Sequence, residues 1–143
     1  MVQTTRDDFE MWLFDMDARL EGLVSRLPDS VAEQLDYSLE SLDAIEGWLL
    51  QEFESVSAAL DDTAKEVIDE LSRYVGETIR KNAGGKWDIE LEDEKNAYFK
   101  MPVLQKPDAW TECPASLVTA AVDRRNGKFI STVLNALLRR AKN

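Results

Sequence analysis

Apolar residues recur at steps of three and four in five segments of the chain, which is the spacing of one buried helix face. The first segment, residues 9–27, follows Thr5, which we expect to cap the helix, and ends at Pro28. The second begins after Ser38, another residue typical of helix starts, and extends to about residue 53. The pattern therefore predicts two helices in the N-terminal part of the chain.

Three further helices are predicted downstream. The third covers residues 62–82, and Gly84 after it is placed to adopt a left-handed cap conformation. The fourth begins at Pro114, because proline fits the first turn of a helix, and the fifth covers residues 128–141.

Between the third and fourth helices the apolar period changes to two, which is typical of strands with one buried face. Residues 87–91 and 97–103 show this alternation, and the polar residues 93–96 between them predict the turn of a hairpin. Pro102 suggests that part of the second strand lies at an edge, and residues 106–109 predict a further turn. The whole chain, residues 1–143, is thus expected to form a single α+β domain with about five helices around a small antiparallel sheet containing one central hairpin.

Gly76 stands inside the third predicted helix, where a glycine costs about 1 kcal/mol relative to alanine. Such a residue suggests that another backbone or a large ring approaches the helix at this point. Trp87 is the candidate for that ring.

The formal net charge is −11, from 28 acidic and 17 basic residues. Such a field repels nucleic acid and anionic lipid and attracts basic surfaces, so the partner that we expect is a basic protein and not a nucleic acid. No stretch approaches the roughly 20 apolar residues needed to span a bilayer, and the N-terminus lacks the features of a secretion signal. We therefore expect no membrane association and a cytoplasmic location.

Cys113 is the single cysteine, and the sequence contains no histidine. An internal disulfide is therefore excluded, and so are the common zinc ligand sets and the Cys–His and Ser–His–Asp mechanisms within one chain. We expect no cofactor and favour a protein that is not an enzyme.

The strand alternation places carboxylates on one face, where they offer a docking surface for a basic partner. The candidate contact residues are Asp88, Glu90, Glu92 and Glu94, with Glu52 and Glu54 as further candidates. Specific metal binding is disfavoured, because the Asp-x-Asp-x-Asp-Gly pattern of a calcium loop is absent.

A second hypothesis is a small-ligand site or an enzyme with a carboxylate pocket formed by Tyr74, Glu77 and Trp87. Its competing interpretation is structural, since Glu77 is within four residues of both Arg73 and Lys81 and can form ordinary ion pairs on the helix. A third hypothesis is a homodimer formed through the first helix.

The first helix carries Met11 and Phe14 in addition to its apolar stripe. These two residues widen its apolar face beyond what a surface helix needs, so the helix is either deeply packed or offers a contact surface. They are the residues through which the homodimer is expected to form.

The order of several residues in the middle of the chain resembles a pattern in small bacterial domains of unknown function. The pattern consists of Tyr74-x-Gly76-Glu77, Gly84-Gly85-x-Trp87, a short hairpin and Pro114-Ala115-Ser116-Leu117-Val118. It covers about residues 62–125, and some relatives of these domains are thought to be immunity-type proteins. The resemblance implies a helix-hairpin-helix α+β unit and supplies no catalytic residues. Together with the charge, it favours an immunity-like or inhibitor-like protein whose acidic surface covers a basic partner.

Overall fold

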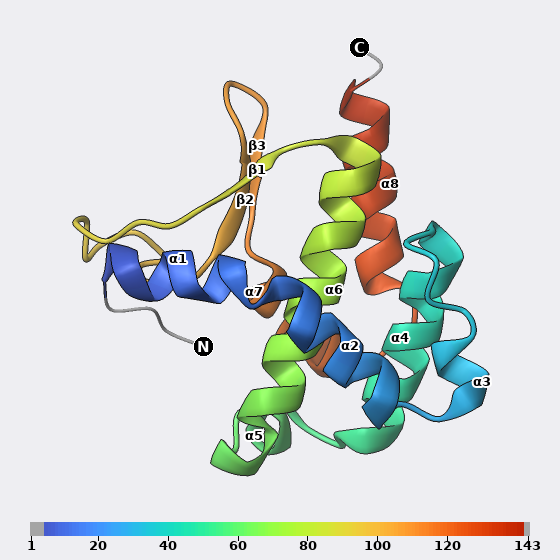
Figure 1. The fold of residues 1–143 in the computed structure, drawn as a ribbon. Helices are drawn as coiled ribbons and strands as arrows, with labels where there is room; N and C mark the ends of the chain where they lie inside the picture. Colours follow the sequence, from blue (N-terminus) through green and yellow to red (C-terminus); the bar gives the residue numbers. More distant parts are fainter. Residues whose placement is uncertain (1–4, 142–143) are drawn as a thin grey trace.

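The computed structural model describes residues 5–141 and confirms an α+β architecture (Figure 1). Its helices are α1 (Arg6–Phe14), α2 (Met16–Arg26), α3 (Asp29–Ala32), α4 (Leu39–Glu52), α5 (Val56–Ala59), the 3₁₀ helix η1 (Asp62–Ala64), α6 (Lys65–Ala83), α7 (Pro114–Arg124) and α8 (Phe129–Ala141). Its strands are β1 (Lys86–Asp88), β2 (Val103–Lys106) and β3 (Trp110–Glu112). The described part of the chain thus has eight α-helices where the sequence predicts five. The helices α3 and α5 are single turns of four residues, too short for a detectable period.

Helix α6 runs through the middle of the molecule, and α2, α7 and α8 pack against it (Figure 1). Helix α4 packs against α7 and α8 on one side of it. Most of the core is therefore formed between helices. The largest apolar side chains that are fully buried are Leu23, Leu42, Ile45, Leu49, Leu71, Ile79, Leu104, Ile130 and Leu134.

Side chains cap several helix ends. The hydroxyls of Thr5 and Ser38 accept hydrogen bonds from the backbone at the starts of α1 and α4, which confirms both predicted caps. The fully buried carboxylate of Glu46 accepts from the backbone N–H groups of Phe129 and Ile130, at 3.0 and 2.9 Å. A negative group there matches the positive end of the α8 dipole. Gly84 ends α6 with φ 89° and ψ −158°, a conformation that glycine favours but not the left-handed cap that was predicted.

The first predicted helix, residues 9–27, is divided at Asp15 into α1 and α2. Asp15 has φ −81° and ψ 3°, outside the helical range. One turn earlier, the carbonyl of Trp12 accepts a 2.7 Å hydrogen bond from Nη1 of Arg73 on α6. In an unbroken helix this carbonyl would accept from the N–H of Met16. The break therefore accompanies a tertiary contact that the apolar period cannot reveal.

The predicted hairpin of residues 87–91 and 97–103 is wrong. Strand β1 pairs antiparallel with β2, with Trp87 opposite Leu104, and residues 89–102 form an irregular connector. The tight hairpin is instead the one between β2 and β3, around the turn that was predicted at residues 106–109. The sheet therefore has three strands in the order β1-β2-β3.

Side chains of the connector hydrogen-bond to their own backbone, while one main-chain bond, from the N–H of Lys100 to the carbonyl of Glu90, joins its two halves. The carboxylate of Glu90 accepts from the N–H groups of Glu92 and Asp93, and that of Asp88 accepts from the N–H of Ile89. The side-chain oxygen of Asn96 accepts from the N–H of Tyr98. Such local bonds compete with a strand ladder for the same backbone groups.

The ring of Trp87 lies directly against Gly76, as the sequence predicts. A Cβ atom at residue 76 would lie 2.1 Å from Cη2 and 2.3 Å from Cζ2 of Trp87, and 3.1 Å from Cγ of Pro114. The rings of Trp87 and Pro114 can therefore lie this close to α6 only because Gly76 has no side chain. The contact joins β1 and the start of α7 to the middle of α6.

Replacing Gly76 with alanine should lower the free energy of unfolding by about 1–3 kcal/mol, because the added methyl group overlaps the Trp87 ring. The matched control is Gly47→Ala on the exposed face of α4, where nothing lies within 4 Å of the new Cβ. That change should stabilise the protein by up to about 1 kcal/mol through helix propensity. Urea denaturation measures the free energy of unfolding of the two variants. An equal change in both would contradict a close contact between residue 76 and the Trp87 ring.

Candidate functional site

Three side chains attach α1 to α6. The indole Nε1 of Trp12 donates to Oδ1 of Asp69 at 2.8 Å, and Nε of Arg73 donates to Oδ2 of the same carboxylate at 2.7 Å. The Arg73 guanidinium also lies over the Trp12 ring, 4.2 Å from its centroid. Trp12 in turn meets the Trp87 ring edge to face, with centroids 4.9 Å apart. The inner face of α1 is therefore held by hydrogen bonds, charge and ring contacts together.

Helix α2 is attached to α6 separately, through a charged pair. The carboxylate of Glu70 is buried and accepts two hydrogen bonds from Arg26, the shorter one 2.8 Å long. The side chain of Arg26 is 40% exposed, so the pair lies at the edge of the interface between the two helices. Both halves of the divided first helix are thus fixed to the same central helix.

Glu77 was predicted as a ligand-binding carboxylate or an ordinary ion-pair residue, and its contacts support the second reading. Oε2 accepts from Nε1 of Trp87 at 2.9 Å and from Nε of Arg80 at 2.8 Å, while Oε1 accepts from Nη2 of Arg80 at 3.0 Å. Its ion-pair partner is therefore Arg80 and not Arg73, which pairs with Asp69. Both oxygens already have donors, so this carboxylate holds Trp87 in place.

Burial works to raise the pKa of Glu77, but hydrogen bonds from Arg80 and Trp87 and the charges of Arg80 and Lys81 outweigh it. The pKa of the carboxyl group is therefore lowered from its ordinary 4.5. A lowered pKa means that the ionised form is stabilised by folding. This group consequently contributes stability only while it is charged.

Tyr74 does not share a cavity with Glu77 and Trp87. Its hydroxyl donates to Oγ of Ser41 and accepts from the backbone N–H of Tyr37, and its ring stacks on the Tyr37 ring. Tyr74 lines a cleft beside α2, whereas Glu77 and Trp87 line a smaller neighbouring hollow. The predicted pocket of three residues is thus divided between two places.

The four acidic residues predicted to bind a partner do not lie on one strand, because only Asp88 belongs to a strand. Asp88 lies in β1 and forms an ion pair with Arg6 at 3.9 Å, while Glu90 turns back to bind its own connector. Both line a hollow of about 340 Å³ between the connector and the sheet. Glu92 and Glu94 are exposed on the connector. The expected alternation fails because residues 89–102 are not a strand.

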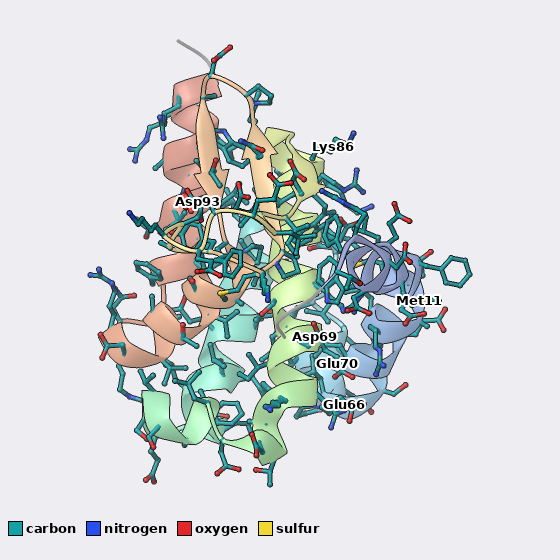
Figure 2. The ribbon with its side chains drawn as sticks, turned by 90° about the vertical axis from the view of Figure 1, so that its left-hand side faces the viewer. Met11, Glu66, Asp69, Glu70, Lys86 and Asp93 are labelled. Carbon is teal, nitrogen blue, oxygen red and sulfur yellow. The ribbon has the colours of Figure 1, made fainter. Side chains whose placement is uncertain are left out.

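A different surface combines apolar and acidic side chains, along the outside of α1 and α2. Met11 is 59% exposed and Phe14 is 83% exposed, and Val24 on α2 is 48% exposed. Figure 2 shows Met11 at the outer edge of the molecule, beyond the helix that carries it. We call this surface the α1–α2 face and define it by Asp7, Glu10, Met11, Phe14, Asp17, Glu21 and Val24.

Met11 and Phe14 were singled out in the sequence, whereas the acidic members were not. Their steps of three and four along the same helices were the signal that could have found them.

Three hollows follow one another along the α1–α2 face. The first, of about 380 Å³, is lined by Asp7, Glu10, Met11 and Phe14. Phe14 also borders the second, of about 230 Å³, and Asp17 borders both the second and the third, of about 490 Å³. The α1–α2 face therefore consists of three adjacent shallow hollows, and each neighbouring pair shares a lining residue.

A metal site and a membrane-spanning helix were also sought among the described residues. Within residues 5–141, no three side chains of the metal-ligating types come together as a cation site would require. None of the helices found there combines the length and hydropathy that crossing a bilayer demands. The α1–α2 face is thus the strongest candidate for a functional surface.

Replacing Glu77 with glutamine should lower the free energy of unfolding by about 1 kcal/mol at pH 7, because a charged hydrogen-bond acceptor is lost. The wild-type carboxylate contributes fully above its unfolded pKa, near 4.5, and loses that contribution as the pH falls through its lower folded pKa. The difference between wild type and variant should therefore disappear in acid. Urea denaturation between pH 7 and pH 3 measures it. The exposed control Glu54→Gln should stay within about 0.5 kcal/mol of wild type at pH 7.

Comparison with known proteins identifies no relative of this chain. No protein-family model matches it, and neither a curated protein nor a solved structure matches it. The resemblance to small bacterial domains with immunity-type relatives therefore stays a prediction. The function has to be argued from the α1–α2 face itself.

Proposed function

We propose that this protein is an acidic binding domain that recognises a basic protein through the α1–α2 face. The observation that carries the proposal is the exposure of Met11 and Phe14, at 59% and 83%, on adjacent turns of α1. Of the four large apolar side chains that are most exposed in the described residues, three lie on α1 and α2. Grouped apolar residues with a polar rim are typical of protein-interaction sites.

The charges around this apolar centre favour a basic partner. Asp7, Glu10, Asp17 and Glu21 are exposed members of the same face, and the whole chain carries a net charge of −11. Complementary charge at the rim of an interface speeds association and selects the partner. A second copy of this chain would bring two acidic rims together, and such like-charge contacts cost several kcal/mol. The repulsion between like charges favours a different, basic protein over the homodimer.

The face is supported by rigid structure on its inner side. Trp12 and Arg73 hold α1, and the Arg26–Glu70 pair holds α2. A surface that is already ordered loses little conformational entropy on binding. The apolar side chains are thus presented in a fixed arrangement.

The acidic connector is a separate surface. Figure 2 places Asp93 of the connector apart from Met11, on another side of the view. The charges of Asp88, Glu90, Glu92 and Glu94 lie on β1 and on this connector, and they can attract a basic partner at long range. They are not the centre of the proposed interface.

Two further features, the unreactive Cys113 thiol and the family resemblance, favour inhibition as the form of binding. Cys113 is buried, and burial raises the pKa of its thiol, which leaves a poor nucleophile. The resemblance to domains with immunity-type relatives points in the same direction. We therefore propose an immunity-like or inhibitor-like role in the cytoplasm, where a lone free cysteine stays reduced.

The double substitution Met11→Ser and Phe14→Ser tests the proposal. A partner is first captured from lysate of the source cell, identified and purified, and its affinity is then measured by calorimetry. We expect binding to weaken about tenfold or more, because buried apolar anchors dominate interface energies. Affinity for the wild-type protein should also fall as salt is added.

The matched control is Leu60→Ser, which removes a side chain that is 63% exposed on another part of the surface. It should leave the affinity unchanged. Thermal unfolding should show all variants folded, since exposed substitutions change stability by only about 0.5 kcal/mol. Equal affinities of the double variant and the control would overturn the proposal. A wild-type dimer that the double substitution dissociates would favour the homodimer instead.

A further inference from the structure

The largest hollow of the α1–α2 face is the cleft of about 490 Å³ between α2 and residues 35–37. Leu20, Val24 and Leu35 supply apolar wall, together with the ring of Tyr37, and Asp17 and Glu21 supply carboxylates. A cleft of this volume is large enough to hold a side chain or a small ligand. Its lining contains no basic residue.

Tyr37 gives the cleft a rigid wall. Its φ of 62° is unusual for an aromatic residue, and hydrogen bonds from both sides hold it there. Its N–H donates to the Tyr74 hydroxyl at 3.0 Å, and its carbonyl accepts from Nδ2 of Asn82 at 2.8 Å. The Tyr74 ring stacks on the Tyr37 ring with centroids 4.9 Å apart, while Nζ of Lys81 lies 4.8 Å from the Tyr37 centroid. The ring is thus already engaged and offers the cleft a fixed apolar edge.

Asp17 and Glu21 are four residues apart on α2, so their carboxylates are neighbours on one helix face. None of the ion pairs in the described residues involves either of them. Arg80 borders the neighbouring hollow together with Asp17 but pairs with Glu77, and Lys81 lies over the Tyr37 ring at the wall of the cleft. Two like charges at this spacing destabilise a helix, and a cation placed between them removes the repulsion.

We infer that this cleft binds a lysine or arginine side chain of the basic partner. The aliphatic part of that side chain packs on Leu20, Val24 and Leu35, and its charged end lies between Asp17 and Glu21. Long basic side chains are suited to such a site, because they combine an apolar stem with a charged end. Asp17 also borders the neighbouring hollow next to Phe14, so one partner surface can cover Met11, Phe14 and the cleft together. The inference rests on the proposed function, whose partner it describes.

The test uses single-residue probes on the ¹⁵N-labelled protein. N-acetyl-lysine amide and N-acetyl-arginine amide are titrated while backbone amide shifts are recorded by NMR, with N-acetyl-norleucine amide as the neutral counterpart. The cationic amides should cause saturable shifts confined to residues 17–25 and 35–37, and the neutral amide should not. Absence of saturation, or shifts scattered over the acidic surface, would overturn the inference.

Two double variants separate a specific cleft from general acidity. Asp17→Asn with Glu21→Gln should weaken binding of the cationic amides about tenfold or more, since both carboxylates hold the charge. Asp108→Asn with Asp123→Asn removes the same number of charges from exposed positions elsewhere and should leave the binding unchanged. An equal loss in both variants would mean nonspecific attraction and would contradict the inference.

The purified partner then distinguishes this inference from the proposed function. A partner whose binding needs Met11 and Phe14 but tolerates Asp17→Asn with Glu21→Gln would overturn the cleft inference and leave the proposed function standing. If the Met11→Ser, Phe14→Ser variant and the Asp17→Asn, Glu21→Gln variant both lose partner binding, the result supports both the proposed function and the cleft inference. If the Met11→Ser, Phe14→Ser variant binds the partner as tightly as the wild type, the proposed function is overturned, whichever result the amide titrations give.

Discussion

The close contact between Trp87 and Gly76 is the constraint on which the arrangement of this protein depends. The indole ring occupies the space that any side chain at residue 76 would need, so β1 can lie directly on α6. The same ring hydrogen-bonds to Glu77 and meets Trp12 edge to face. One residue therefore joins the central helix, the sheet and the N-terminal helix, and it can do so only because α6 contains a glycine where helices usually avoid one.

The exposed face of α1 follows from the way its other face is held. Arg73 bonds to the Trp12 carbonyl and lies over the Trp12 ring, which fixes the inner side of the helix by a few strong contacts. Met11 and Phe14 are then left without a place in the core. A folded monomer has no stability reason to keep such side chains in water, and their arrangement among carboxylates is the basis of the proposed interface. The three hollows along the same helices would give the proposed partner a continuous surface.

Sequence reasoning succeeded where one local signal had one structural meaning. Thr5 and Ser38 cap their helices as expected, and the glycine inside α6 indicated the tryptophan that covers it. It failed at residues 89–102, where alternating apolar and acidic residues predicted a strand. There the same carboxylates that gave the polar half of the pattern bind the local backbone and replace the ladder. Periodicity reports which residues are apolar, but it does not report which backbone groups their polar neighbours bind.

By itself the sequence determined the α+β class, the positions of the long helices, the acidic character of the surface and the need for a ring at Gly76. Each of these depends on composition or on contacts between near neighbours in the chain. Only the tertiary structure decided where the first helix breaks, which strands pair, and that Tyr74 and Glu77 line separate hollows while Asp17 borders both. These features depend on contacts between residues far apart in sequence, such as Arg73 with Trp12, and spacing along the chain carries no record of them.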